Sequence, residues 1–271
     1  MNILNNEKYR FLYEDDDLKN NVALLVKGGS NAYHLSSESS DFDLRGITIE
    51  NEDTLLGIRK FDCFVNKETD TTIYGLKKFI SMAMKSNPNA LELLFTDKED
   101  IIYCSDIGKL LLENRDIFLS KQILKPIYGI TANNEKRYLN PSISSPLSKY
   151  DNEKDKMKKI NKVYCETIRR LLAGLCLART GEFIVNATTL VNDDSLADFR
   201  IAFPFVRDLY KVKYAEDDRY FDMNVIDTLE SILEPEIKCS TMLPDKVGRD
   251  KVNWLQKECF KMNLNKIYVK T

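Results

Sequence analysis

The order of apolar and polar residues predicts strands and a helix in the first part of the chain. Residues 21–27 (NVALLVK) form a short apolar run that ends at a Gly-Gly pair, which is typical of a buried strand. Residues 41–49 (DFDLRGITI) alternate, so we expect a second strand there. Residues 61–65 and 70–73 predict a third strand and an edge strand. Residues 74–86 place apolar side chains three and four positions apart, which predicts an amphipathic helix that ends before an Asn-Pro pair.

The rest of the chain has a helical pattern. Strand signals fade after residue 120, and residues 155–180 follow helical spacing up to Gly181, which occupies a typical C-cap position. We therefore expect an α+β fold in two domains. Residues 1–118 would form a small mixed β-sheet domain flanked by helices, and residues 119–271 a mainly α-helical domain.

Composition indicates a soluble globular protein and excludes several classes. The chain has 271 residues, of which 43% are hydrophobic and 30% charged. No apolar run approaches the roughly 18 residues that span a bilayer, and the polar, acidic N-terminus does not predict a secretory signal. The six cysteines are scattered without a CxxC pair, so we expect a reduced, cytoplasmic protein without a zinc site and without membrane association.

The histidine content and the charge distribution limit the kinds of site and of partner that we expect. His34 is the single histidine, which excludes sites built from several histidines. The net charge of −2 conceals an uneven spread, because residues 216–236 carry eight acidic and one basic side chain, and residues 246–270 carry seven basic and two acidic ones. A protein that coats nucleic acid would be more basic overall. The basic tail around Trp254 could bind RNA, or it could be a solvated final helix that packs through its apolar residues.

The first chemical feature is a glycine-rich turn after the first predicted strand. The strand ends in Gly-Gly-Ser, in which Gly29 allows a tight turn and Ser30 adds a hydroxyl group. Such a turn brings backbone amides close to a ligand, and the start of a helix after it suits a phosphate. The turn therefore predicts a phosphate-binding site.

The second feature is a pair of carboxylates about ten residues later. Asp41 and Asp43 are two positions apart, so on a strand both would project from one face while the apolar residues beside them anchor the other face. Two hard oxygen ligands side by side suit Mg²⁺ that holds triphosphate oxygens. A third carboxylate on a neighbouring strand would complete a two-metal site; Asp70 fits that role, and Glu68 is the alternative.

Other polar residues near these motifs have two interpretations each. Ser40 could contact a phosphate or only shape the turn before Asp41. Arg45 could reach the triphosphate or form a salt bridge with the carboxylates. Lys162 and Arg169 are seven positions apart and thus share a helix face, which could contact phosphates or simply be solvated.

The segment GGSNAYHLSSESSDFDLRGI resembles the signature of the DNA polymerase β nucleotidyltransferase superfamily. It is most similar to predicted nucleotidyltransferases of the RNA-repair-pathway group, whose pattern is roughly GSxxYGLxxxxSDxDxRG. The resemblance continues over about residues 22–200, including DTTIYGLKKFISMAMKSNPNALELLF. There are two departures: His34 replaces the usual glycine, and the long helix has no histidine near position 165.

This resemblance implies transfer of an NMP from an NTP to an acceptor hydroxyl, with Mg²⁺ or Mn²⁺ and release of pyrophosphate; it favours an RNA end as the acceptor. Gly29 and Ser30 would hold the β- and γ-phosphates, Asp41 and Asp43 the first metal, and Asp43 and Asp70 the second. A protein or a small-molecule acceptor fits the same core. A catalytically idle nucleotide sensor or interaction protein on this fold is a further alternative. The sequence does not predict an oligomeric state.

Overall fold

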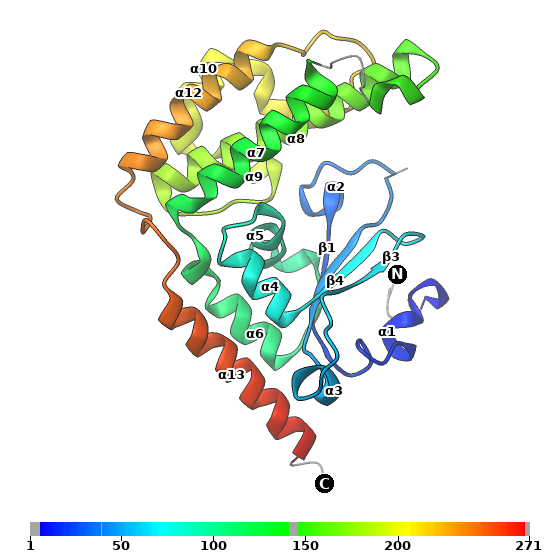
Figure 1. Ribbon diagram of the computed structural model, residues 1–271. Coiled ribbons are helices and arrows are strands. Elements are labelled where there is room, and N and C mark those ends of the chain that lie inside the picture. Colours follow the sequence, from blue (N-terminus) through cyan, green and yellow to red (C-terminus); the bar gives the residue numbers. More distant parts are fainter. Residues whose placement is uncertain (1–5, 39, 141–145, 269–271) are drawn as a thin grey trace. The chain divides into compact units, whose positions relative to one another are not determined.

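The protein is described by a computed structural model that covers residues 6–38, 40–140 and 146–268 (Figure 1). Its contacts divide the chain into two compact units. The sheet unit is drawn from Met1–Phe118 and Val247–Thr271, and the helical unit is Leu119–Lys246. The first division lies after Phe118, whereas the final segment groups with the sheet unit and not with the helical region in which we expected it.

The sheet has five strands in the order β3-β4-β2-β1-β5. β2 pairs with β4 in parallel, and the other neighbouring strands are antiparallel. The strands are β1 (Val22–Lys27), β2 (Leu44–Thr48), β3 (Cys63–Asn66), β4 (Thr71–Gly75) and β5 (Ile101–Cys104). This mixed sheet with helices, followed by a helical region, confirms the predicted α+β class.

Short helices connect and cover the strands of the sheet unit. They are α1 (Phe11–Glu14), α2 (Gly29–Ala32), α3 (Glu52–Leu55), α4 (Leu76–Ala83), α5 (Pro88–Leu94) and α6 (Asp106–Glu113), joined by the C-terminal α13 (Arg249–Tyr268). The predicted amphipathic helix is α4, whose apolar stripe is buried. Asn87 ends that segment and caps α5, because its side chain accepts a hydrogen bond from the Asn89 amide.

Strand β2 begins later than the alternating pattern predicts. The expected strand started at Asp41, whereas β2 starts at Leu44, so both carboxylates of the pair lie in the segment before the strand. The backbone carbonyl of Asp41 accepts a hydrogen bond at 2.9 Å from the side chain of Asn31 instead of a strand partner. Phe42 packs against the core that includes Leu44, so the apolar anchor of this segment is present as predicted.

Helix α13 packs against α4 and α6 of the sheet unit (Figure 1). One side of α13 is buried, and it is formed by Val252, Leu255, Cys259 and Asn263. The Asn263 side chain donates a hydrogen bond of 3.3 Å to the backbone carbonyl of Glu50. The sheet unit is therefore built from the two ends of the described chain.

The helical unit is organised around α8, which packs against α7, α11 and α12. Its helices are α7 (Leu124–Asn134), α8 (Glu153–Thr180), α9 (Ala187–Asn192), α10 (Ala197–Ala202), α11 (Leu209–Tyr214) and α12 (Met223–Cys239). Helix α8 is the predicted long helix, and it ends at Gly181, whose φ of 81° is the left-handed conformation of a C-cap glycine. Within the described residues, none of the helices is long and apolar enough to cross a membrane.

Candidate functional site

The glycine-rich turn lies directly against Asp43. The Gly28 amide donates a hydrogen bond of 2.8 Å to the Asp43 carbonyl, which joins the end of β1 to the segment before β2. A Cβ atom at Gly29 would lie 1.8 Å from the carboxylate oxygen Oδ2 of Asp43, and one at Gly28 would lie 2.6 Å from Cγ of Arg45. Gly29 thus allows the close approach of the turn to the Asp43 carboxylate, and it also has a positive φ of 54°, whereas a Cβ atom at Gly28 would displace the Arg45 side chain.

Helix α2 starts within this turn. Ser30 is half-buried in its first turn, and its carbonyl accepts a hydrogen bond of 2.9 Å from the Leu35 amide. The first amides of a helix have no acceptor within the helix, so they are available to a ligand or to water. The turn therefore presents backbone donors near the carboxylate of Asp43.

The carboxylates of the pair have different surroundings. Asp41 is exposed, while Asp43 is half-buried between the turn and the N-terminal segment. Burial and then the negative charge of Asp43 raise the pKa of the Tyr9 hydroxyl above its ordinary value.

Asp70 immediately precedes β4, as Asp43 immediately precedes β2, and Asp70 is held by Arg45. The parallel register pairs Leu44 with Thr71, so Asp43 and Asp70 each immediately precede a paired residue. The Arg45 guanidinium donates to the Asp70 carboxylate at 3.1 Å and also to the Asp70 backbone carbonyl. Asp70 has a φ of 40°, which is uncommon for a residue with a side chain. Arg45 therefore forms a salt bridge with Asp70, whereas the bridge was considered for the pair Asp41 and Asp43.

The donor set suits a divalent cation by its chemistry. Asp41, Asp43 and Asp70 offer hard carboxylate oxygens of the kind that Mg²⁺ and Mn²⁺ prefer. In the part of the chain that the structure describes, these three side chains do not form a group whose ligand atoms all lie within 4.8 Å. The ligand atoms of the three carboxylates are therefore not gathered at one point. Asp43 and Asp70 each precede one residue of the pair Leu44 and Thr71 in the parallel register.

The remaining predicted residues are placed as follows. The Ser40 hydroxyl accepts a hydrogen bond of 2.9 Å from the Ser37 amide, which is the turn-forming role considered for it. Lys162 and Arg169 lie on α8 in the helical unit. Lys162 is exposed, but Arg169 is fully buried, so the predicted shared solvated face is wrong for Arg169. The physical reason is that α8 is covered by other helices of its unit beyond its first turns.

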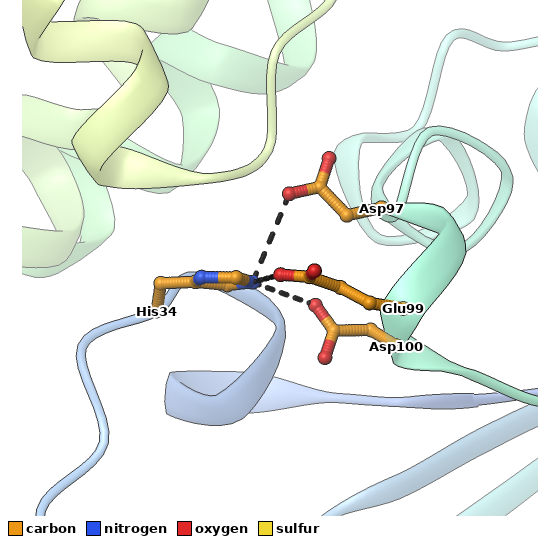
Figure 2. Close-up of side chains that lie close together, drawn as sticks. All are labelled: His34, Asp97, Glu99 and Asp100. Carbon is orange, nitrogen blue, oxygen red and sulfur yellow. Dashed lines mark hydrogen bonds and ion pairs between the residues drawn. The ribbon is translucent and has the colours of Figure 1, made fainter.

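Sequence reasoning missed a cluster around the single histidine (Figure 2). His34 Nε2 lies 2.8 Å from Asp100 Oδ2, 3.5 Å from Glu99 Oε1 and 3.7 Å from Asp97 Oδ2. The Lys27 ammonium contacts the other oxygen of the buried Asp100 at 2.7 Å. His34 has a φ of 55°, the left-handed region that glycine adopts without strain.

Contacts of the two residues that follow α2 join this part of the chain to α5 and to the segment before β5. The Tyr33 hydroxyl donates a buried hydrogen bond of 2.7 Å to Glu92 on α5, and His34 bonds to Asp100 in the short helix η3 (Lys98–Asp100). The residues that immediately follow the glycine-rich turn are thereby fixed. The pairs are 59 and 66 positions apart, so no local pattern reveals them; the histidine in place of glycine was the available signal.

The contacts of Asp100 lead to a stability prediction. Asp100→Asn removes the charge that Lys27 and His34 contact, so we expect the free energy of unfolding to fall by about 1–3 kcal/mol. Glu99→Gln is the matched control; its side chain is 71% exposed, and its loss should change stability by less than about 0.5 kcal/mol. Urea unfolding measures both. Equal effects of the two substitutions would contradict the structural role of Asp100.

Comparison with known proteins agrees with this arrangement. The model of the RNA repair pathway DNA polymerase beta family matches residues 8–236. No curated protein and no solved structure matches the chain. The matched span contains the glycine-rich turn, all three carboxylates and nearly all of the helical unit. The chain therefore belongs to the RNA repair pathway DNA polymerase beta family.

Proposed function

We propose that the protein transfers an NMP from an NTP to an acceptor hydroxyl and releases pyrophosphate. One observation carries the proposal: Gly29 approaches the Asp43 carboxylate so closely that no side chain fits between them. A turn that can bind phosphates and an acidic group that can hold a cation are thus neighbours. Membership of a DNA polymerase beta family supports the same chemistry.

The turn would bind the polyphosphate of the NTP. Backbone amides near Gly29 and the Ser30 hydroxyl donate hydrogen bonds to phosphate oxygens without adding negative charge. Asp41 and Asp43, by contrast, repel a bare triphosphate. The nucleotide therefore binds together with a counter-charge, and Asp41, Asp43 and Asp70 are the residues that would hold Mg²⁺ or Mn²⁺. When bound, such a cation offsets phosphate charge and lowers the pKa of a hydroxyl group.

The acceptor side of the reaction would depend on Asp70. In the transfer, the acceptor oxygen forms a bond to the α-phosphorus, the bond from that phosphorus to the bridging oxygen breaks, and pyrophosphate leaves with the electron pair. The acceptor proton passes to solvent. Arg45 fixes the orientation of the Asp70 carboxylate through the contacts described above. Such a positioned group keeps its geometry without reorganisation during the reaction.

Label transfer tests the proposal. The protein is incubated with each of the four NTPs carrying ³²P at the α-phosphate, Mg²⁺ or Mn²⁺, and single-stranded RNA with free hydroxyl ends. We expect label in the RNA with the native chain and none with the Asp41→Asn/Asp43→Asn double variant. A parallel reaction with a cell extract detects label in proteins or small molecules.

The outcomes separate the alternatives. Label in a protein or a small molecule, but not in RNA, would support the proposed transferase activity and show that the acceptor is not RNA. Binding of Mg²⁺-NTP by the folded protein without transfer to any acceptor would contradict the proposal and support the idle nucleotide sensor. The RNA acceptor itself is our choice because the family description refers to RNA repair.

A further inference from the structure

Basic and aromatic side chains gather on one part of the helical unit. There the π-helix η6 (Glu135–Leu139) packs against α8 and against the short helix η7 (Pro146–Lys149). We call this region the basic-aromatic surface, and it consists of Arg137, Tyr138, Lys149, Tyr150, Lys159 and Lys162. Within it, Arg137, Lys149 and Lys162 are exposed, and the other members are half-buried.

The cations and the rings of this surface are in contact with one another. The Arg137 guanidinium lies 5.6 Å from the centre of the Tyr138 ring, and the Lys159 ammonium lies 5.1 Å from it. The Lys149 ammonium lies 5.4 Å from the centre of the Tyr150 ring. Cation–π contacts of this length are attractive and orient both partners. The surface therefore combines two aromatic rings, each in contact with at least one positive group.

The positive charges of the surface also repel one another. Burial, followed by the neighbouring charges of Lys162, Lys149 and Arg137, lowers the pKa of the Lys159 ammonium, while Glu166 acts in the opposite direction. Three neighbouring cations thus disfavour the charge of Lys159, and the carboxylate of Glu166 opposes their effect. A polyanion placed here would relieve that repulsion.

Other lysines at the start of α8 have a different environment. Lys154 and Lys158 form ion pairs with Glu216 at 2.6 and 3.2 Å, and Lys156 pairs with Glu153 at 2.6 Å. These three lysines belong to the same helix and are of the same residue type as Lys159 and Lys162. They are matched controls, because their removal lowers the net charge of the protein without touching the basic-aromatic surface.

We infer that the basic-aromatic surface binds single-stranded RNA, with its cations on backbone phosphates and its two tyrosines against bases. Positively charged side chains interleaved with stacking rings are the common arrangement for single-stranded nucleic acid. The four cations extend over three elements of the unit, which suits a strand with several phosphates better than one nucleotide. The assignment of this RNA as the acceptor rests on the proposed function; the binding of RNA does not.

A binding measurement tests the inference with the full chain. Fluorescence anisotropy of a labelled 16-nucleotide single-stranded RNA is followed at several salt concentrations between 50 and 200 mM. Removing three phosphate contacts with Arg137→Gln/Lys159→Gln/Lys162→Gln should make the slope of log K against log salt less negative by about two. The affinity should fall at least about tenfold. The control Lys154→Gln/Lys156→Gln/Lys158→Gln should retain the slope and the affinity of the native chain.

The aromatic part of the inference has its own variants. Tyr138→Leu and Tyr150→Leu should each weaken binding at least about fivefold, since loss of stacking on one base has at least this effect. Their salt slope should equal that of the native chain, because no phosphate contact is lost. Thermal unfolding of every variant verifies that it is folded.

Three results would overturn the inference: native affinity in the triple variant, equal losses in the triple variant and its control, or displacement of the RNA by stoichiometric Mg²⁺-NTP. The experiment also separates this surface from the catalytic proposal. Asp43→Asn should bind RNA as the native chain does while it loses transfer. A native chain that binds RNA through this surface but transfers no label would contradict the proposed function and leave the RNA-binding surface intact.

Discussion

Asp43→Asn is expected to lower the rate of NMP transfer by more than about a hundredfold. Loss of a group that only supports a metal ligand already costs about 10–100-fold, and Asp43 is proposed to hold the cation itself. The amide is nearly the same size as the carboxylate, so the contact with Gly29 remains and the fold should be retained. Initial rates of label transfer at saturating NTP measure the effect.

The matched control for this prediction is Glu68→Gln. Glu68 is exposed and was the alternative candidate for the third carboxylate. Asp70→Asn should reduce transfer in the same way as Asp43→Asn, whereas Glu68→Gln should leave the rate within about twofold of the native value, as expected for an exposed group outside the site. A large loss with Glu68→Gln and none with Asp70→Asn would assign the role of the third carboxylate to Glu68 instead of Asp70. Native rates in Asp43→Asn would refute the proposed catalytic site.

Gly29→Ala is expected to have an effect of similar size through a different cause. The added Cβ would overlap the Asp43 carboxylate, and a positive φ costs about 1–2 kcal/mol for a residue with a side chain. We therefore expect the free energy of unfolding to fall by at least about 1 kcal/mol. Transfer should fall about a hundredfold, because a displacement of about 1 Å in an active site has such an effect.

Gly129→Ala is the matched control for the glycine substitution. Gly129 lies within α7, and a Cβ atom there would meet nothing within 4 Å. Alanine should therefore stabilise the protein by about 0.4–1 kcal/mol, because it reduces the freedom of the unfolded chain. Thermal unfolding and label transfer are measured on both variants. A Gly29→Ala variant as active and as stable as Gly129→Ala would contradict the close approach of the turn to Asp43.

Local sequence patterns predicted the helices and strands whose position depends mainly on residues close to one another in the sequence. The helical spacing of apolar residues identifies α8, and Gly181 marks its end, because both depend on interactions within one or two turns. The strand β1 is similarly clear, since all its central residues are buried. The alternation of residues 41–49 was misleading at its start, because it cannot show that the Asn31 side chain binds the Asp41 backbone.

The members of the candidate site are proposed from the sequence, whereas their contacts could not be predicted from it. The glycine-rich turn and the carboxylate pair are separated by about ten residues, and their types indicate the chemistry. The partner of Arg45 depends on the parallel pairing of β2 with β4, which brings Asp70 into reach from 25 positions away. Arg169 illustrates the opposite limit: an arginine is usually exposed, and only the helices packed around α8 determine that this one is buried.

The position of α13 has a consequence for synthesis on the ribosome. The chain emerges from its N-terminus, so the strands are available long before the helix that packs against α4 and α6. At about 5–20 residues per second, the helix follows Phe118 after roughly 7–30 s. During that interval the apolar side chains that Val252, Leu255 and Cys259 later cover remain accessible to chaperones, while the helical unit is completed first. The part of the protein that carries the carboxylates is thus completed after the helical unit, although its sheet is translated before that unit.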